Sequence, residues 1–266
     1  MKIDSNFIIE DLALVRNNSP LVHNITNYVV MNNTANALLA VGASPIMAHA
    51  IEEVEEMVNI SGALVINIGT LSAQWVAAME KAMIRAKALD KPIVLDPVGA
   101  GASQFRNQVL KRLLESSPPT IVRGNASEIL ATLSSSGKTK GVDATDSSES
   151  AIETGKTLSD MTGGTVVISG AIDYIINGDL KYTVANGDPL MTKVTGLGCT
   201  ATALNGAFAA VQKDHSRAAF SAMAVMGIAG EMAKRISQGP GSFQMHFLDA
   251  LYQMNEDDIR KYFRKE

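Results

Sequence analysis

The only cysteine of the chain, Cys199, follows two closely spaced glycines, Gly196 and Gly198, and precedes small residues with helical spacing. Glycine lets a backbone approach a ligand closely, and the free N–H groups at the start of a helix attract negative charge. Residues 194–203 therefore predict an anion site, with phosphate as its natural ligand. A helix N-terminus favours the thiolate form of cysteine, so we expect Cys199 to exchange a proton near neutral pH.

Two further polar segments follow apolar, β-branched runs. The first, residues 96–101, begins with Asp96, whose carboxylate could hold a metal ion or its water, or could only stabilise a turn. The second, residues 123–128, opens a helix and places Asn125 at its cap with Glu128 three positions later. Capping alone would explain this spacing. The functional alternative is that Asn125 and Glu128 organise magnesium and its waters while Arg123 meets a nucleotide phosphate.

Residues 22–36 contain five asparagines in otherwise apolar surroundings. Burying amides costs free energy unless they find partners, so some of them could bind a small polar ligand or a neighbouring subunit. Caps and turns would explain any single one equally well. The small-residue segment 42–49 follows and is typical of a loop, which could present Met47 to a heteroaromatic ring.

Two roles remain open for the side chain of Cys199: a covalent nucleophile, or a polar group beside a hydroxyl that accepts a phosphate. A nucleophile would need an orienting imidazole, which folding could bring from His23 or His49.

Residues 137–139 offer a second possible phosphate motif, which we reject. Gly137, Lys138 and Thr139 imitate the end of a P-loop, but the first glycine of that motif and a preceding strand are both missing.

The elements that must position these residues alternate between short β-branched runs and longer helical patterns, which is typical of a parallel α/β sheet. Ligands of such sheets bind at the carboxyl ends of the strands, so we expect the polar segments to face one crevice. Residues 174–184 predict an antiparallel hairpin at the sheet edge, and residues 134–148 a surface loop. The predicted strands are 64–68, 92–95, 120–122 and 165–168, and the predicted helices are 31–40, 51–60, 71–89, 104–114, 148–161, 199–211, 216–236 and 241–251.

Composition limits the class of protein. The 266 residues, 46% hydrophobic and 19% charged, favour one globular domain spanning residues 1–266. A net charge of −4 gives no basic surface, so we expect neither a nucleic-acid partner nor binding to an anionic membrane. The N-terminal residues lack the layout of a signal peptide, one cysteine cannot form an internal disulfide, and no apolar run reaches about 18 residues. We expect a cytoplasmic protein.

Together these segments resemble the hydroxyethylthiazole kinases, thiamine-salvage enzymes of the ribokinase superfamily. The resemblance covers nearly the whole chain and is carried, in order, by residues 22–36, 42–49, 96–101, 123–128 and 194–199. It implies a ribokinase-like three-layer α/β/α sandwich with a mostly parallel central sheet. It further implies ATP-dependent phosphorylation of the primary hydroxyl of 4-methyl-5-(2-hydroxyethyl)thiazole, in a homotrimer whose substrate pocket lies at a subunit boundary.

The resemblance also implies residue roles. Cys199 replaces the aspartate that serves as base in most of the superfamily. A thiol is a poorer acceptor, but a loose phosphoryl-transfer transition state asks little of a base, so Cys199→Ala should lower turnover without abolishing it. The implied roles are substrate binding by Met47, Asn24, Thr26 and Gly196, nucleotide binding by Arg123, Ser169 and Asn125, magnesium binding by Asp96 and Glu128, and catalysis by Cys199, Gly196 and Gly198.

Three other functions stay open at this point. The first is a related superfamily enzyme acting on hydroxymethylpyrimidine, pyridoxal or hydrated nicotinamide cofactors, which Cys199 in place of aspartate disfavours. The second is a ligand sensor that has lost turnover, against which the intact Asp96, Asn125 and Glu128 argue. The third is a cysteine-nucleophile hydrolase, which would need no nucleotide.

Overall fold

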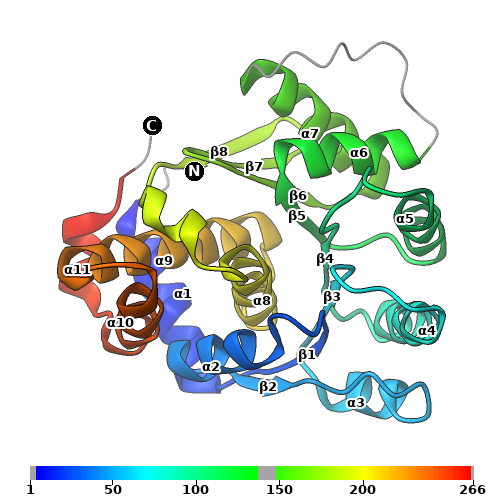
Figure 1. Ribbon diagram of the computed structural model, residues 1–266, viewed down its shortest axis with the longest axis horizontal. Helices are drawn as coiled ribbons and strands as arrows, with labels where there is room; N and C mark the ends of the chain where they lie inside the picture. Colours follow the sequence, from blue (N-terminus) through cyan, green and yellow to red (C-terminus); the bar gives the residue numbers. More distant parts are fainter. Residues whose placement is uncertain (1–3, 137–147, 265–266) are drawn as a thin grey trace.

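A computed structural model describes residues 4–136 and 148–264. Its middle layer is an eight-stranded sheet with the order β2-β1-β3-β4-β5-β6-β7-β8 (Figure 1). The first six strands in this order run parallel, and the last two form an antiparallel hairpin at the edge. The predicted parallel sheet and hairpin are confirmed. The strands are β1 (Leu21–Ile25), β2 (Ser44–Ile46), β3 (Ala63–Asn67), β4 (Ile93–Asp96), β5 (Ile121–Asn125), β6 (Thr165–Ser169), β7 (Asp173–Asn177) and β8 (Leu180–Val184).

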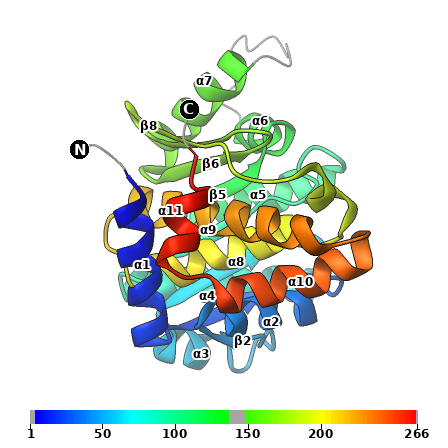
Figure 2. The ribbon, with the colours of Figure 1, turned by 90° about the vertical axis from the view of Figure 1, so that its left-hand side faces the viewer.

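Helices cover both faces of the sheet, which gives the expected three layers (Figure 1). Figure 2 shows one helical layer from the front, with α1, α8, α9, α10 and α11 lying over the sheet. This layer comprises α1 (Ser5–Asn18), α2 (Met31–Val41), α8 (Leu197–Ala209), α9 (His215–Ile236), α10 (Pro240–Gln253) and α11 (Glu256–Tyr262). The opposite face carries α3 (Val54–Ile60), α4 (Ala73–Ala88), α5 (Gln104–Ser116), α6 (Ala126–Ser135) and α7 (Ser148–Thr162), and a short 3-10 helix covers Pro189–Lys193.

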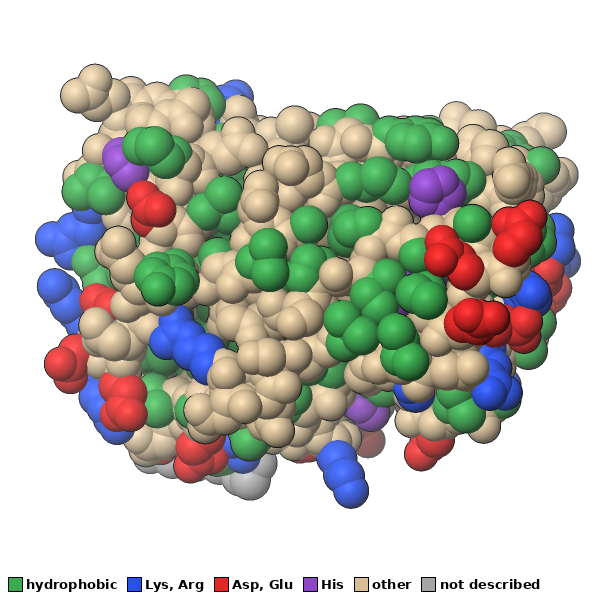
Figure 3. Space-filling view, turned by 90° about the horizontal axis from the view of Figure 1, so that it is seen from below, with side chains coloured by type: hydrophobic (Ala, Val, Ile, Leu, Met, Phe, Trp, Pro, Cys, Tyr) green, Lys and Arg blue, Asp and Glu red, His purple; other side chains and the backbone are tan. Residues whose placement is uncertain are grey.

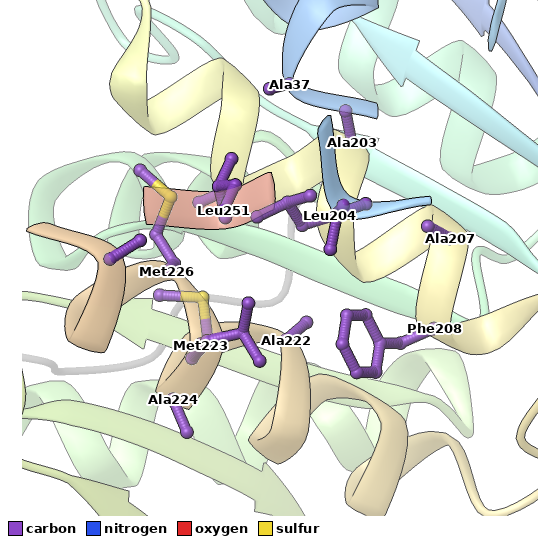
Figure 4. Packing of buried hydrophobic residues seen from close by; sticks show 14 of the residues in the cluster. Ala37, Ala203, Leu204, Ala207, Phe208, Ala222, Met223, Ala224, Met226 and Leu251 are labelled. Carbon is purple, nitrogen blue, oxygen red and sulfur yellow. The ribbon is translucent and has the colours of Figure 1, made fainter. Parts of the chain in front are cut away.

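Small side chains let α8 lie close to the sheet. A β-carbon at Gly206 would lie 2.5 Å from Cγ2 of Val65 in β3, so only glycine fits there. Ala203 and Ala207 of α8 and Ala222 of α9 continue this close packing, and the larger side chains of Leu204, Phe208 and Met223 fill the space between the two helices (Figure 4). Burial of these apolar surfaces holds α8 over the central strands. Its N-terminus is thereby fixed above the carboxyl ends of the strands.

Several elements differ from the sequence prediction. The strand β1 was not predicted, because His23 and Asn24 interrupt its apolar pattern although both are fully buried. Residues 44–46, expected in a loop, form the short edge strand β2, and a proline is tolerated there because an edge strand needs fewer ladder bonds. The helix α1 was missed as well.

Most predicted boundaries shift by one to three residues, and two changes bear on the predicted segments. Helix α8 begins at Leu197 rather than at Cys199, because Gly196 supplies the cap. Ser134 and Ser135, placed in a surface loop, end α6 instead, where their hydroxyls donate to carbonyl oxygens one turn earlier. Residues 137–147 of that predicted loop, which include Gly137, Lys138 and Thr139, lie outside the described residues. No helix in the described part of the chain combines the length and apolar character needed to cross a membrane.

Candidate active site

The carboxyl ends of the parallel strands bring polar side chains together beside the start of α8. Asn67 ends β3, Asp96 ends β4, Asn125 ends β5 and Ser169 ends β6, while Asn27 follows β1. Parallel strands all end at the same edge of a sheet, so these side chains lie along the edge where the sequence predicts a crevice. Thr202 of α8 donates to Asp96 at 2.8 Å, which places the helix at this edge.

The start of α8, where the sequence predicts an anion site, has two positions that favour glycine. Gly196 caps the helix with φ +87°, and a β-carbon there would lie 2.7 Å from Cγ1 of Val30. A β-carbon at Gly198 would lie 3.0 Å from Nη1 of Arg123. The N–H groups of the first helical turn have no partner within a helix, and the helix dipole adds positive potential at this end. The predicted phosphate cradle therefore lies at the crevice, next to the guanidinium of Arg123.

Arg123 and Ser169, both predicted to bind the nucleotide, lie side by side on neighbouring strands. Nη2 of Arg123 donates to Oγ of Ser169 at 2.7 Å, and this hydroxyl donates to the carbonyl oxygen of Gly124 at 3.3 Å. Nε of Arg123 is buried without a hydrogen-bond partner among the described residues. Nη1 of the same guanidinium lies toward the start of α8, beside Gly198, which suits the predicted nucleotide role.

Asp96 is a buried carboxylate, with 1% of its surface exposed. Its Oδ2 accepts from Nδ2 of Asn67 and Oγ1 of Thr202, both at 2.8 Å. Burial raises the pKa of Asp96 to about 6, although the charge of Arg123 lowers it. The sequence analysis did not single out Asn67 or Thr202. Asn67 could have been found, because it is the polar residue next to the end of the predicted strand 64–68, much as Asp96 follows the predicted strand 92–95.

Asn125 and Glu128 form the predicted capping box of α6. Oδ1 of Asn125 accepts from the backbone N–H of Glu128 at 2.9 Å, and Oε2 of Glu128 accepts from that of Asn125 at 3.0 Å. Oε1 of Glu128 accepts in addition from the N–H of Gly99 at 3.0 Å. Glu128 therefore ties the glycine turn after β4 to the end of β5, and the capping interpretation is confirmed.

The magnesium roles predicted for Asp96 and Glu128 stay predictions. Nowhere in residues 4–136 and 148–264 do three or more His, Cys, Asp or Glu side chains gather as a metal site. Mg²⁺ bound with a nucleotide needs only one or two carboxylates, since waters and phosphates complete its shell. Asp96 suits this kind of site, because a cation would offset the burial that raises the pKa of its carboxyl to about 6.

Cys199 lies in the first turn of α8, and its Sγ accepts a hydrogen bond from Nδ2 of Asn27 at 3.5 Å. Burial and the negative charge of Asp96 raise the pKa of the thiol to about 11. The prediction that this cysteine titrates near neutral pH is therefore wrong, because desolvation of the sulfur outweighs the helix N-terminus.

The histidines do not support a nucleophilic cysteine. Nε2 of His23 bonds to the carbonyl oxygen of Ala48 at 2.8 Å, and the ring of His49 packs against Trp75 with centroids 4.4 Å apart. Among the described residues, no imidazole hydrogen-bonds to the sulfur of Cys199. The hydrolase alternative therefore lacks the orienting base that it requires.

Besides Gly196 at the cap of α8, three residues are predicted to contact the thiazole, and they lie on β1 or directly after β1 and β2. Met47 directly follows β2 and is partly exposed. Thr26 follows the last residue of β1 and is 2% exposed. Asn24 is fully buried within β1, donates to the carbonyl oxygen of Val22, and has an Oδ1 atom with no partner in the described part of the chain. Substrate contact stays a prediction for all three.

The architecture defines a class: a ribokinase-like α/β fold with a glycine-capped helix at the carboxyl ends of its strands. The fold is shared with a ribokinase-like superfamily protein of Enterococcus faecalis V583 at a TM-score of 0.66 and 10% identity, each chain covered over 96%. It is also shared with the pyridoxal kinase of Staphylococcus aureus in complex with ADP at a TM-score of 0.64 and 16% identity, covering 80% of this chain and 88% of that one. At such identities the likeness shows the fold alone.

Sequence comparison places the chain more narrowly. The model of the hydroxyethylthiazole kinase family matches residues 12–257, and this chain belongs to that family. A hydroxyethylthiazole kinase of Leptospira biflexa is 74% identical over 95% of both chains, and one of Syntrophus aciditrophicus is 60% identical over 94% of this chain and 93% of that one. A solved hydroxyethylthiazole kinase structure from Pyrococcus horikoshii OT3 matches with a TM-score of 0.92 and 46% identity, over 98% of both chains. The resemblance found in the sequence is confirmed.

Proposed function

We propose that this chain transfers the γ-phosphoryl group of ATP to the primary hydroxyl of 4-methyl-5-(2-hydroxyethyl)thiazole, as a step of thiamine salvage. The observation that carries the proposal is the start of α8, where Gly196 caps an anion site that Arg123 faces from β5 and Asp96 from β4. Membership of the hydroxyethylthiazole kinase family supports the thiazole alcohol as acceptor.

The chemistry of the transfer requires little beyond positioning. The hydroxyl oxygen forms a bond to the γ-phosphorus while the bond from that phosphorus to the leaving oxygen of ADP breaks, and the hydroxyl proton is released. Charge accumulates on the transferring oxygens and on ADP, where the backbone N–H groups of α8 and the guanidinium of Arg123 would stabilise it. Catalysis by this site is thus mainly electrostatic.

We infer that Cys199 orients the hydroxyl and does not ionise before the transfer. With burial and Asp96 raising its pKa to about 11, the side chain is a neutral thiol at pH 7. A neutral thiol can still hydrogen-bond to an alcohol. Because the loose transition state needs little help from a base, an orienting role is sufficient.

We propose that Asp96 and Glu128 hold Mg²⁺ together with the ATP phosphates, and that Asn125 lies beside it. When bound, this ion would neutralise phosphate charge. The residues of this chain would act by binding: Asp96 from the buried end of β4, and Glu128 while still bonded to the N–H groups of Gly99 and Asn125. Both backbone bonds hold Glu128 toward the crevice.

We also propose a homotrimer with the substrate pocket at a subunit boundary. Tyr28 and Val29, beside the crevice, are 65% and 64% exposed, and Leu39 and Ile60 are 58% and 61% exposed. Figure 3 shows hydrophobic side chains gathered across the middle of the lower face of the molecule, with charged side chains toward its sides. Such patches often mark subunit contacts. A monomeric mass by light scattering in a fully active preparation would contradict the trimer.

The cytoplasmic location that the sequence predicts stays a prediction.

The decisive experiment offers three alcohols to the protein with Mg-ATP. Hydroxyethylthiazole, hydroxymethylpyrimidine and pyridoxal are supplied at equal concentration, ADP release is followed, and the products are identified by mass spectrometry. We expect thiazole monophosphate and ADP in equal amounts, with little product from the other two. ATP binding without turnover of any alcohol would refute the proposal and favour the ligand sensor.

A further inference from the structure

Asn27 has a buried side-chain amide that contacts the sulfur of Cys199. The two residues lie on different elements, since Asn27 follows β1 and Cys199 lies in α8. The side chain of Asn27 is 4% exposed. Nδ2 donates to Oδ1 of Asn67 at 2.8 Å and to Sγ of Cys199 at 3.5 Å. Asn67 in turn donates to Asp96 at 2.8 Å. A continuous chain of hydrogen bonds therefore links the thiol to the buried carboxylate.

Backbone N–H groups fix which way these amides point. The N–H of Val29 donates to Oδ1 of Asn27 at 3.1 Å, and the N–H of Gly69 donates to Oδ1 of Asn67 at 2.9 Å. A backbone N–H can only donate, so each of these atoms must be the carbonyl oxygen of its amide. Asn27 consequently presents its NH₂ group to the sulfur, and the sulfur is the acceptor in that contact.

Gly69 has no side chain, and this leaves room for the Asn27 amide. A β-carbon at Gly69 would lie 2.6 Å from Nδ2 of Asn27 and 2.8 Å from its Cγ, which is closer than real side-chain carbons approach. The backbone that follows β3 thus packs directly against the Asn27 amide. Two independent observations, the hydrogen bonds and the close packing, fix one position for this amide.

We propose that Asn27 is a positioning residue for the phosphoryl transfer. Its NH₂ group donates to the Cys199 sulfur from the side on which Asn67 lies. The S–H bond is therefore left to point into the crevice, toward the acceptor hydroxyl. The proposal deepens the proposed function and depends on it for its kinetic consequence. The direction of the S–H bond is a property of the free protein and is measured without substrate.

The kinetic test asks whether Asn27 acts through Cys199. Asn27→Leu removes the donor at similar side-chain volume. We expect kcat to fall roughly tenfold, within the range that a small misplacement of a reacting group costs, with the KM for ATP changed less than about twofold. In a Cys199→Ala background the same substitution should change kcat by less than about twofold, because coupled residues are not additive. An equal loss of kcat in both backgrounds would overturn the proposal.

A second variant moves the amide without removing it. Gly69→Ala should displace Asn27 from the sulfur and lower kcat in the same pattern as Asn27→Leu. Gly241→Ala is the matched control, since a β-carbon there meets no atom within 4 Å and its kinetics should stay unchanged. A Gly69→Ala protein that folds and keeps the kcat of the parent would count against the proposal.

The spectroscopic test uses the single cysteine of the chain, whose S–H stretching band in the infrared has no competitor. Asn27→Leu and Gly69→Ala should both move this band to higher frequency, because hydrogen bonds strengthen one another and a sulfur that stops accepting one holds its own proton more tightly. An unmoved band in both variants would refute the proposed orientation. A shifted band in a protein that fails to phosphorylate the thiazole would support the orientation while refuting the reaction.

Discussion

Burial raises the pKa of two carboxyl groups, Asp96 in the candidate site and Asp173 at the start of β7. Asp173 is 7% exposed, and its Oδ1 accepts from the N–H of Gly170 at 3.0 Å. Burial raises its pKa from 3.8 to about 6, although the Gly170 bond and the charge of Arg123 lower it. The folded state therefore holds this proton more tightly than the unfolded state. The resulting stabilisation is complete below about pH 4 and is lost as the pH rises to about 6.

Asp173→Asn should stabilise the ligand-free protein at neutral pH. The amide keeps an oxygen for the N–H of Gly170 and removes the buried charge, which is worth on the order of 2–3 kcal/mol at pH 7. Urea unfolding between pH 4 and 7 should show a smaller fall in stability than in the parent, while some fall persists because burial also raises the pKa of Asp96. The exposed Asp249→Asn is the matched control. A pH slope identical to that of the parent would contradict this account.

At the scale of elements, the start of α8 depends on two glycines for different reasons. Gly196 combines φ +87° with a close approach to Val30, so both conformation and space exclude a side chain. Gly198 has only a tight approach to the end of the Arg123 side chain, which can move. Substitution by alanine should therefore affect mainly the fold at Gly196 and mainly the nucleotide site at Gly198.

We expect Gly196→Ala to lower the free energy of unfolding by about 1–3 kcal/mol and to abolish measurable turnover, because the helix cap must shift. Gly198→Ala should cost less than about 1 kcal/mol, since only a flexible side chain must give way, but should raise the KM for ATP by displacing Arg123. Chemical denaturation and steady-state kinetics measure both. Equal stability losses in the two variants would show that the cap conformation at Gly196 is not the decisive constraint.

At the scale of the whole molecule, an ion pair with a buried carboxylate holds the first helix, α1, against α9. Asp11 of α1 is fully buried and accepts from Nε of Arg217 at 3.1 Å and from Oγ of Ser221 at 2.6 Å, both in α9. Gln212 donates to the same carboxylate at 2.9 Å. Glu10, by contrast, pairs with Arg217 while 60% exposed. Screening by water makes the exposed pair much weaker than the buried one.

Asp11→Ala should destabilise the protein by about 3–5 kcal/mol, because it leaves Arg217 partly buried without its main partner. Glu10→Ala should cost less than about 1 kcal/mol. Neither residue borders the crevice, so the KM values of the folded variants should match those of the parent. Denaturation midpoints and kinetics at low temperature test this. Similar midpoints for the two variants would show that α1 is not held by Asp11.

The sequence by itself determined the alternation of strands and helices, the polar segments 96–101 and 123–128 that follow two of the predicted strands, and the glycine turn before α8. These are local features: β-branched runs, capping residues and glycines act through their own backbone and nearest neighbours. The same order of motifs was sufficient to identify the family. The strand β1 was not predicted from the sequence, because the buried polar residues His23 and Asn24 interrupt the apolar pattern that indicates a strand.

Only the tertiary structure decided how the site residues act on one another. Asn27 and Cys199 are 172 positions apart, and Asp96 and Thr202 are 106 apart, so no local pattern relates them. The protonation of Cys199 shows the same limit. Its place at a helix start favoured a thiolate, whereas burial and the charge of Asp96 raise its pKa to about 11. Desolvation depends on every group that packs around the sulfur, and those groups come together only when the chain folds.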